Sequence, residues 1–196
     1  ARVDEFADVW TDTTLVERLR DFTFEAWVIE AETPRTYKES VDVLRFGKAE
    51  INANPDGIDR GGTLFDSRKL VGIMIRDVML DTSSTSYKQG FAIYREMLMA
   101  TPHYVSLRSS TNTRPDQIDA GRQWLRLNLA TTSFGLALHP VSQALQEFEE
   151  MRSHYEEAHI LLAEPGETVQ MLARLGYGQQ TPQTKRWPID AKLVNA

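Results

Sequence analysis

Few polar side chains in this sequence are spaced so that they could do chemistry together. The histidines stand at positions 103, 139, 154 and 159, and no two are four residues apart, the spacing that puts two metal ligands on one helix face. The chain has no cysteine, which removes thiolate ligands, thiolate nucleophiles and disulfides. The motifs G-x-S-x-G, G-x-x-x-x-G-K and G-x-G-x-x-G are absent. We therefore expect no metal site and none of the common nucleotide or hydrolase sites.

Two short segments carry the remaining chemistry. A loop that starts with proline follows the apolar run 136–138, and a basic pair precedes Trp187 and Pro188. Alone, such a basic pair would most often be an ordinary surface pair. Together the segments suit a flavin, which needs backbone N–H donors near N5 and O4, an apolar wall for its ring, and a cation for its phosphate. A guanidinium meets a phosphate with two parallel hydrogen bonds. The candidate cofactor-binding residues are Pro140, Val141, Ser142, Gln143, Lys185 and Arg186.

A long helix must position the loop. The spacing predicts a helix over 116–134, with Pro115 at its start and Gly135 at the left-handed position that ends many helices. Its apolar residues form two adjacent stripes and leave only a narrow polar strip. A helix that is apolar on two faces packs on most sides, so we expect it to be the central buried helix of the fold.

The other elements are predicted from apolar periodicity and from proline and glycine. Residues 48–62 contain the turn 54–57 and are expected to form a loop, either a surface connection or a lid. Residues 169–175 fit a helix or a strand, and their alternation favours a strand. Further helices are predicted over 1–31, 33–47, 63–80, 85–100 and 145–162, and a further strand over 103–107. This balance indicates an α+β fold dominated by helices.

Composition limits the class of protein. The chain has 196 residues, enough for one compact core, and we expect a single domain over 1–196. Its net charge of −6 argues against nucleic acid as the main partner. No apolar run approaches the ~18 residues that a membrane-spanning helix needs, so no membrane partner is expected.

Four stretches resemble the flavin-dependent nitroreductase superfamily, and most nearly its Acg-like branch, in which one long chain holds two nitroreductase-like halves. They are AGRQWLRLNLA (120–130), GLALHPVSQALQE (135–147), VQMLARLGYG (169–178) and KRWPID (185–190). The resemblance implies a mixed, mainly antiparallel sheet flanked by helices, with the 116–134 helix at its centre and 169–175 as a strand. It implies FMN as cofactor, with the main chain of 140–143 at the ring, Arg186 at the phosphate and Lys185 beside it.

The same resemblance implies an activity and a setting. Superfamily members pass a hydride through the flavin between NAD(P)H and a nitro or quinone-like acceptor. Relatives in the Acg-like branch are bacterial and often carry a twin-arginine export signal, which implies the periplasm, with the cytoplasm as the alternative. Superfamily members usually build each site at an interface, which implies an oligomer.

The sequence also departs from the superfamily. The phosphate clamp R-x-S-x-R and the loop P-S-x-x-N-x-Q-P-W are absent from 1–196. The chain therefore resembles the carboxy-terminal portion of a longer protein, which would need its missing amino-terminal half or a second copy to complete a site. Two alternatives stay open: a protein that stores FMN beneath a lid formed by 48–62, and an association domain without flavin.

Overall fold

The computed structural model describes residues 7–62, 67, 72, 75–179 and 183–193. The chain divides into two compact units, which we call the sheet unit (Ala1–Glu32 and Ile93–Gln179) and the tail unit (Thr33–Ala92 and Gln180–Ala196). The single domain expected over 1–196 stays a prediction. Within the described ranges, no helix is both long and apolar enough to cross a membrane.

The sheet unit is built on a four-stranded sheet in which every neighbouring pair is antiparallel. Its strands are, in order across the sheet, β1 (Ala7–Trp10), β4 (His103–Ser109), β6 (Thr168–Gly176) and β5 (Ala137–Pro140). Four successive residues of β4, from Tyr104 to Leu107, are buried. A strand buried on both faces must be covered by helices on both sides. The α+β fold with an antiparallel sheet flanked by helices is thus confirmed, as is the strand predicted at 169–175.

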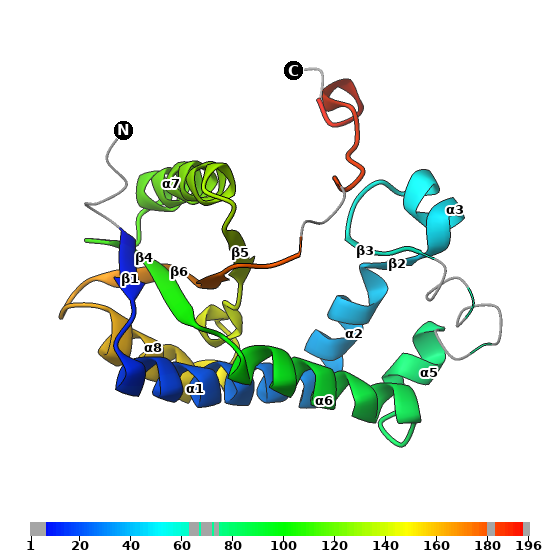
Figure 1. Ribbon diagram of the computed structural model, residues 1–196, viewed down its shortest axis with the longest axis horizontal. Helices are drawn as coiled ribbons and strands as arrows, with labels where there is room; N and C mark the ends of the chain where they lie inside the picture. Colours follow the sequence, from blue (N-terminus) through cyan, green and yellow to red (C-terminus); the bar gives the residue numbers. More distant parts are fainter. Residues whose placement is uncertain (1–6, 63–66, 68–71, 73–74, 180–182, 194–196) are drawn as a thin grey trace. The chain divides into compact units, whose positions relative to one another are not determined.

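Helices cover the two faces of this sheet unequally. Figure 1 shows α1 (Thr13–Glu32) and α8 (Arg152–Leu162) on one side and α7 (Arg114–Ser133) on the other. The α1 and α8 side holds the larger apolar core, which includes Phe22, Tyr104 and Leu172. The α7 side holds a small cluster of Val105, Leu107, Leu127 and Ala173. Successive β4 side chains alternate between these two cores, as the pleat requires.

The α7 helix lies where it was predicted, but it is not buried on most sides in this chain. It begins with a capping box between Thr113 and Asp116, and Gly135 follows it at φ 70°. Only Leu127 and Thr131 of this helix are buried, whereas Leu125 is 59% and Leu129 is 62% exposed. The periodicity correctly gave two apolar stripes. It could not show that this chain covers only one of them.

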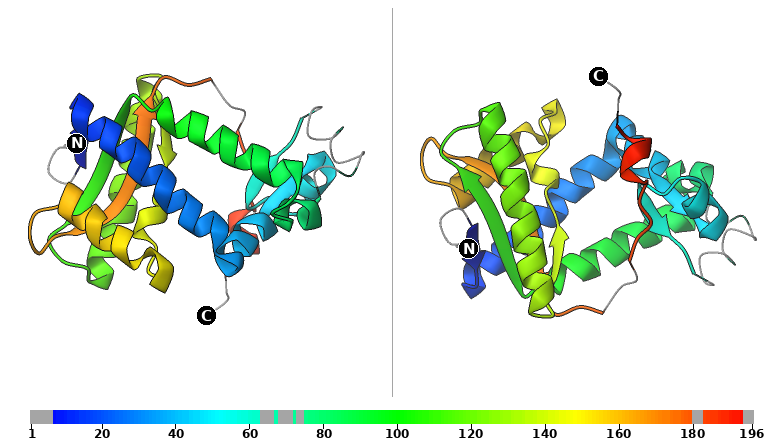
Figure 2. Two further views of the ribbon diagram at one scale, coloured as in Figure 1. Left: turned by 90° about the horizontal axis from the view of Figure 1, so that it is seen from below. Right: turned by 90° about the horizontal axis from the view of Figure 1, so that it is seen from above.

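The tail unit contains more regular structure than predicted. Figure 2 shows it from two further sides. Its elements are α2 (Pro34–Asp42), β2 (Leu44–Phe46), α3 (Gly47–Ala53), β3 (Ile58–Arg60), α5 (Arg76–Leu80) and the 3-10 turn η3 (Ile189–Ala191). The strands β2 and β3 pair in parallel, with α3 as their connection. The predicted loop at 48–62 is therefore wrong, and the helix expected over 33–47 ends at Asp42. Local periodicity missed both because short parallel strands are specified by their pairing.

Other boundaries also differ from the sequence-based expectation. Residues 7–10 form a strand, not the start of a helix, because they pair with β4. The helix expected over 145–162 is α8 preceded by two 3-10 turns, η1 (Gln143–Leu145) and η2 (Glu149–Met151). The helix over 85–100 is confirmed as α6 (Thr85–Met99) and the strand over 103–107 as β4. Most of the helix expected over 63–80 lies outside the described residues.

Candidate functional site

The loop at 140–143 is held to the sheet by its second residue. Pro140 ends β5 opposite Ala173 of β6. The Val141 N–H donates to the Leu172 carbonyl at 3.0 Å, and the Val141 side chain is 4% exposed within the larger core. Proline has no N–H, and the Val141 N–H is already in use. Of the four residues predicted to face a flavin, Pro140 and Val141 therefore fix the loop and do not donate from it.

The next two residues leave their N–H groups available. Ser142 and Gln143 are both half-buried, at the start of η1. Neither backbone N–H donates to any acceptor within the part of the chain that the structure describes. Buried N–H groups almost always have a partner, from protein, water or ligand, and the first N–H groups of a helical turn have none within the turn itself. Two adjacent donors of this kind suit an acceptor edge such as a ring nitrogen beside a carbonyl oxygen.

The basic pair lies in the other unit and is exposed. Lys185 and Arg186 are in the segment 183–193, which we call the tail. The Arg186 guanidinium donates to the Lys185 carbonyl at 2.8 Å and has no carboxylate partner among the described residues. Both cations can therefore meet an anion. The loop at 140–143 belongs to the sheet unit, and the tail belongs to the tail unit.

Asp56, which was not among the predicted site residues, holds the tail. The Trp187 indole N–H donates to an Asp56 carboxylate oxygen at 2.9 Å, and the Arg45 guanidinium donates to the other oxygen at 3.0 Å. The indole hydrogen bond and then the guanidinium lower the pKa of Asp56 below its ordinary value of 3.8. The turn at 54–57 and the Trp-Pro pair were both visible in the sequence. Their association across 131 residues was not.

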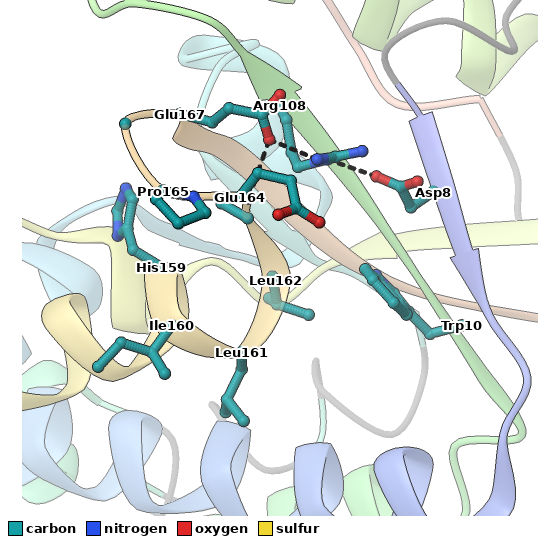
Figure 3. A pocket seen from close by; sticks show the side chains of 12 residues that line it. Asp8, Trp10, Arg108, His159, Ile160, Leu161, Leu162, Glu164, Pro165 and Glu167 are labelled. Atoms are coloured by element: carbon teal, nitrogen blue, oxygen red, sulfur yellow. Dashed lines mark hydrogen bonds and ion pairs between the residues drawn. The ribbon is translucent and has the colours of Figure 1, made fainter.

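The sheet unit also contains an open cavity of about 740 Å³ at the end of α8 (Figure 3). Arg108 lies at its edge between Asp8, at 2.6 Å, and Glu167. The hydrogen bond that its guanidinium donates to Asp8 is the main reason that the pKa of Arg108 is raised. One guanidinium is thus shared between two carboxylates, which leaves this group with one excess negative charge. The cavity contains none of the predicted site residues. Among the described residues, no three His, Asp or Glu side chains are grouped so as to hold a metal ion.

Comparison with known proteins relates the chain to others by fold. No protein-family model and no curated protein matches it. It is similar to the FMN-dependent nitroreductase NfnB of Mycobacterium smegmatis, solved in complex with NADPH, at 18% identity and a TM-score of 0.51, over 97% of this chain and 78% of that one. At this identity the likeness shows a nitroreductase-like fold, as the resemblance implied.

Two further solved structures are similar at lower scores. One is the FMN and NADPH-dependent nitroreductase NfnB of Sphingopyxis sp. strain HMH, at 16% identity and a TM-score of 0.49, over 97% of this chain and 78% of that one. The other is a nitroreductase-like family protein of Bacillus cereus, at 15% identity and a TM-score of 0.41, over 61% of this chain and 65% of that one.

Proposed function

We propose that the chain is an FMN-binding oxidoreductase of the nitroreductase type. The observation that carries the proposal is that the backbone N–H groups of two half-buried residues, Ser142 and Gln143, lack an acceptor within the described ranges, in a nitroreductase-like fold. Bound FMN would supply hydride transfer between NAD(P)H and a nitro or quinone-like acceptor. The protein then needs no side chain as general acid or base, which agrees with the sparse spacing of its titratable residues.

The chain's own residues have two tasks in this proposal. Ser142 and Gln143 donate backbone hydrogen bonds to the polar edge of the ring, and Val141 keeps them in place through its bond to Leu172. Arg186, with Lys185 beside it, binds the phosphate through charge-assisted hydrogen bonds. In this proposal, a further amino-terminal half or a second copy completes the site.

A flavin titration tests the proposal. The purified protein is mixed with increasing FMN, and binding is followed by quenching of flavin fluorescence and by the visible spectrum. We expect saturable binding, and bleaching of the bound flavin when NADPH is added without oxygen. Protein that does not bind FMN contradicts the proposal. Bound flavin that NADPH cannot reduce would favour the storage alternative over turnover.

We further propose that a second copy covers the exposed stripe of α7. Ile118, Leu125 and Leu129 lie on one side of the helix, opposite the buried Leu127. Asp119, Arg122 and Arg126 flank the stripe on one side. In an antiparallel pair, the same flank of each helix faces its copy in reverse order, so acid can meet base. The apolar stripe and the pairing of Asp119 with Arg126 of the copy therefore favour a second copy of this chain as the occupant.

The oligomeric state tests this part. We expect a dimer in size-exclusion chromatography with light scattering, and Leu129→Glu should weaken it at least ~10-fold because a charge replaces an apolar contact at the interface. The matched control is Ile160→Glu, at an exposed isoleucine of α8 outside the stripe, which should leave the dimer intact. A wild-type monomer, or equal effects of both variants, would mean that a second copy does not cover the stripe.

A further inference from the structure

The turn at 54–57 holds the Asp56 carboxylate in a fixed place. The Asp56 N–H donates to the Asn54 carbonyl at 2.7 Å, and the Ile58 N–H donates to the Val43 carbonyl at 2.9 Å. Gly57 has φ 78°, and a Cβ added there would lie 2.2 Å from the Val43 carbonyl oxygen. Only glycine fits this conformation and this close approach. The turn is therefore locked against the start of β2.

Arg45 aligns the carboxylate from the other side. Its side chain is mostly buried, and it donates to the Asp42 carbonyl at 2.9 Å and to Asp56 at 3.0 Å. A guanidinium held at two points has little freedom to swing away. One carboxylate oxygen of Asp56 is thus occupied by Arg45, and the other is directed to a different partner.

That partner is the tail. Trp187 donates its indole N–H to Asp56 at 2.9 Å, and the Lys192 ammonium lies 5.0 Å from the centre of the indole ring. Trp187 is the only residue of 183–193 that is not exposed. Among the described residues, its contacts are therefore the main restraint on this segment. Arg186 precedes it directly, so restraint of the indole also restrains the backbone that carries the guanidinium.

We propose that Asp56 and Trp187 are positioning residues that hold Arg186 in place for a phosphate. The inference rests on the proposed function, because it requires Arg186 to bind the phosphate of FMN. Asp56 and Trp187 themselves do not touch the flavin. We call the pair the clasp. An arginine on a freely moving segment loses conformational entropy when it binds a phosphate. An arginine on a restrained segment loses less. The clasp thus raises the affinity for flavins that carry a phosphate.

Trp187→Phe tests the clasp because it removes the N–H donor and keeps an aromatic ring for Lys192. We expect its affinity for FMN to fall by about tenfold, while its affinity for riboflavin, which has no phosphate, stays unchanged. In an Arg186→Ala background the same change should lower FMN affinity by much less than tenfold, because only Lys185 remains to bind the phosphate. The matched control is Trp10→Phe, which removes an indole N–H that donates to Ser106 at 3.0 Å in the sheet unit, and it should leave the ratio of FMN to riboflavin affinity unchanged.

Hydrogen exchange of the protein without flavin provides a second measurement. Trp187→Phe and Asp56→Ala should both speed exchange in 183–193 and leave 140–146 as in the wild type. Unchanged exchange in 183–193 would refute the clasp. Faster exchange with an unaltered FMN to riboflavin ratio would refute the positioning role while the proposed function stands. A wild-type protein that binds neither flavin would overturn the proposed function and the positioning role together, and the exchange result would still decide whether the clasp exists.

Discussion

The loop at 140–143 and the tail at 183–193 are fixed by different kinds of contact. The loop is tied to β6 by the main-chain bond of Val141 and by the burial of its side chain. The tail is tied to the turn at 54–57 by the Trp187 indole. In the proposed site, the loop therefore offers FMN its backbone, whereas the tail offers side chains. Substitutions in the loop should act mainly through folding, and substitutions in the tail mainly through affinity.

Val141→Asp should have the largest effect of all and should act on stability. It places a charge in the larger core with no partner for it, which costs more than about 3 kcal/mol in free energy of unfolding. Urea denaturation measures the loss. The variant should also lose FMN binding in proportion to its unfolded fraction, because the donors at 142 and 143 depend on the same attachment.

The matched control for this prediction is Val9→Asp. Val9 lies on the edge strand β1 and is 55% exposed, so the same substitution should cost less than about 1 kcal/mol. Equal losses at the two positions would show that the loop is not held by burial of its valine.

Arg186→Ala should have the largest effect on affinity while it leaves stability unchanged. The exposed guanidinium makes no tertiary contact in the described part of the chain, so the urea midpoint should match the wild type. Loss of a charge-assisted hydrogen bond should weaken the free energy of FMN binding by about 1.5–3 kcal/mol. Isothermal titration with FMN and with riboflavin separates the phosphate from the ring. Unchanged FMN affinity would show that Arg186 is not the phosphate ligand.

The sequence predicted the loop and the tail but not what holds them. Pro115 and Gly135 marked the limits of α7, and alternation favoured β6 as a strand, because these patterns depend on neighbours in the chain. The Val141 bond to Leu172 could not be predicted, because it depends on the register between two strands. The association of Asp56 with Trp187 could not be predicted either, because it joins two segments without regular structure that are 131 residues apart in the chain. Long-range pairing is set by tertiary packing, and local periodicity contains no information about it.

Lowering the pH should break the hydrogen bond between Trp187 and Asp56, which holds the tail, before it affects the loop at 140–143. The indole N–H and the Arg45 guanidinium depress the pKa of Asp56 below 3.8. The stabilisation from a depressed pKa is complete above the unfolded-state pKa and is lost as pH falls through the folded-state pKa. The Trp187 indole N–H resonance should therefore shift between about pH 5 and pH 2, while the Val141 amide stays constant. Asp56→Asn should abolish the transition, and a transition that survives in this variant would assign it to another group.

Gln143→Ala should have the smallest effect, and this expectation separates the two segments most clearly. The side chain of Gln143 is removed, but its backbone N–H remains in place because Val141 still fixes the loop. FMN affinity should therefore stay within about 0.5 kcal/mol of the wild type, in contrast to Arg186→Ala in the tail. A loss as large as that of Arg186→Ala would mean that the Gln143 amide side chain contacts the flavin. The loop would then bind through its side chains, as the tail does, and the distinction between the two segments would fail.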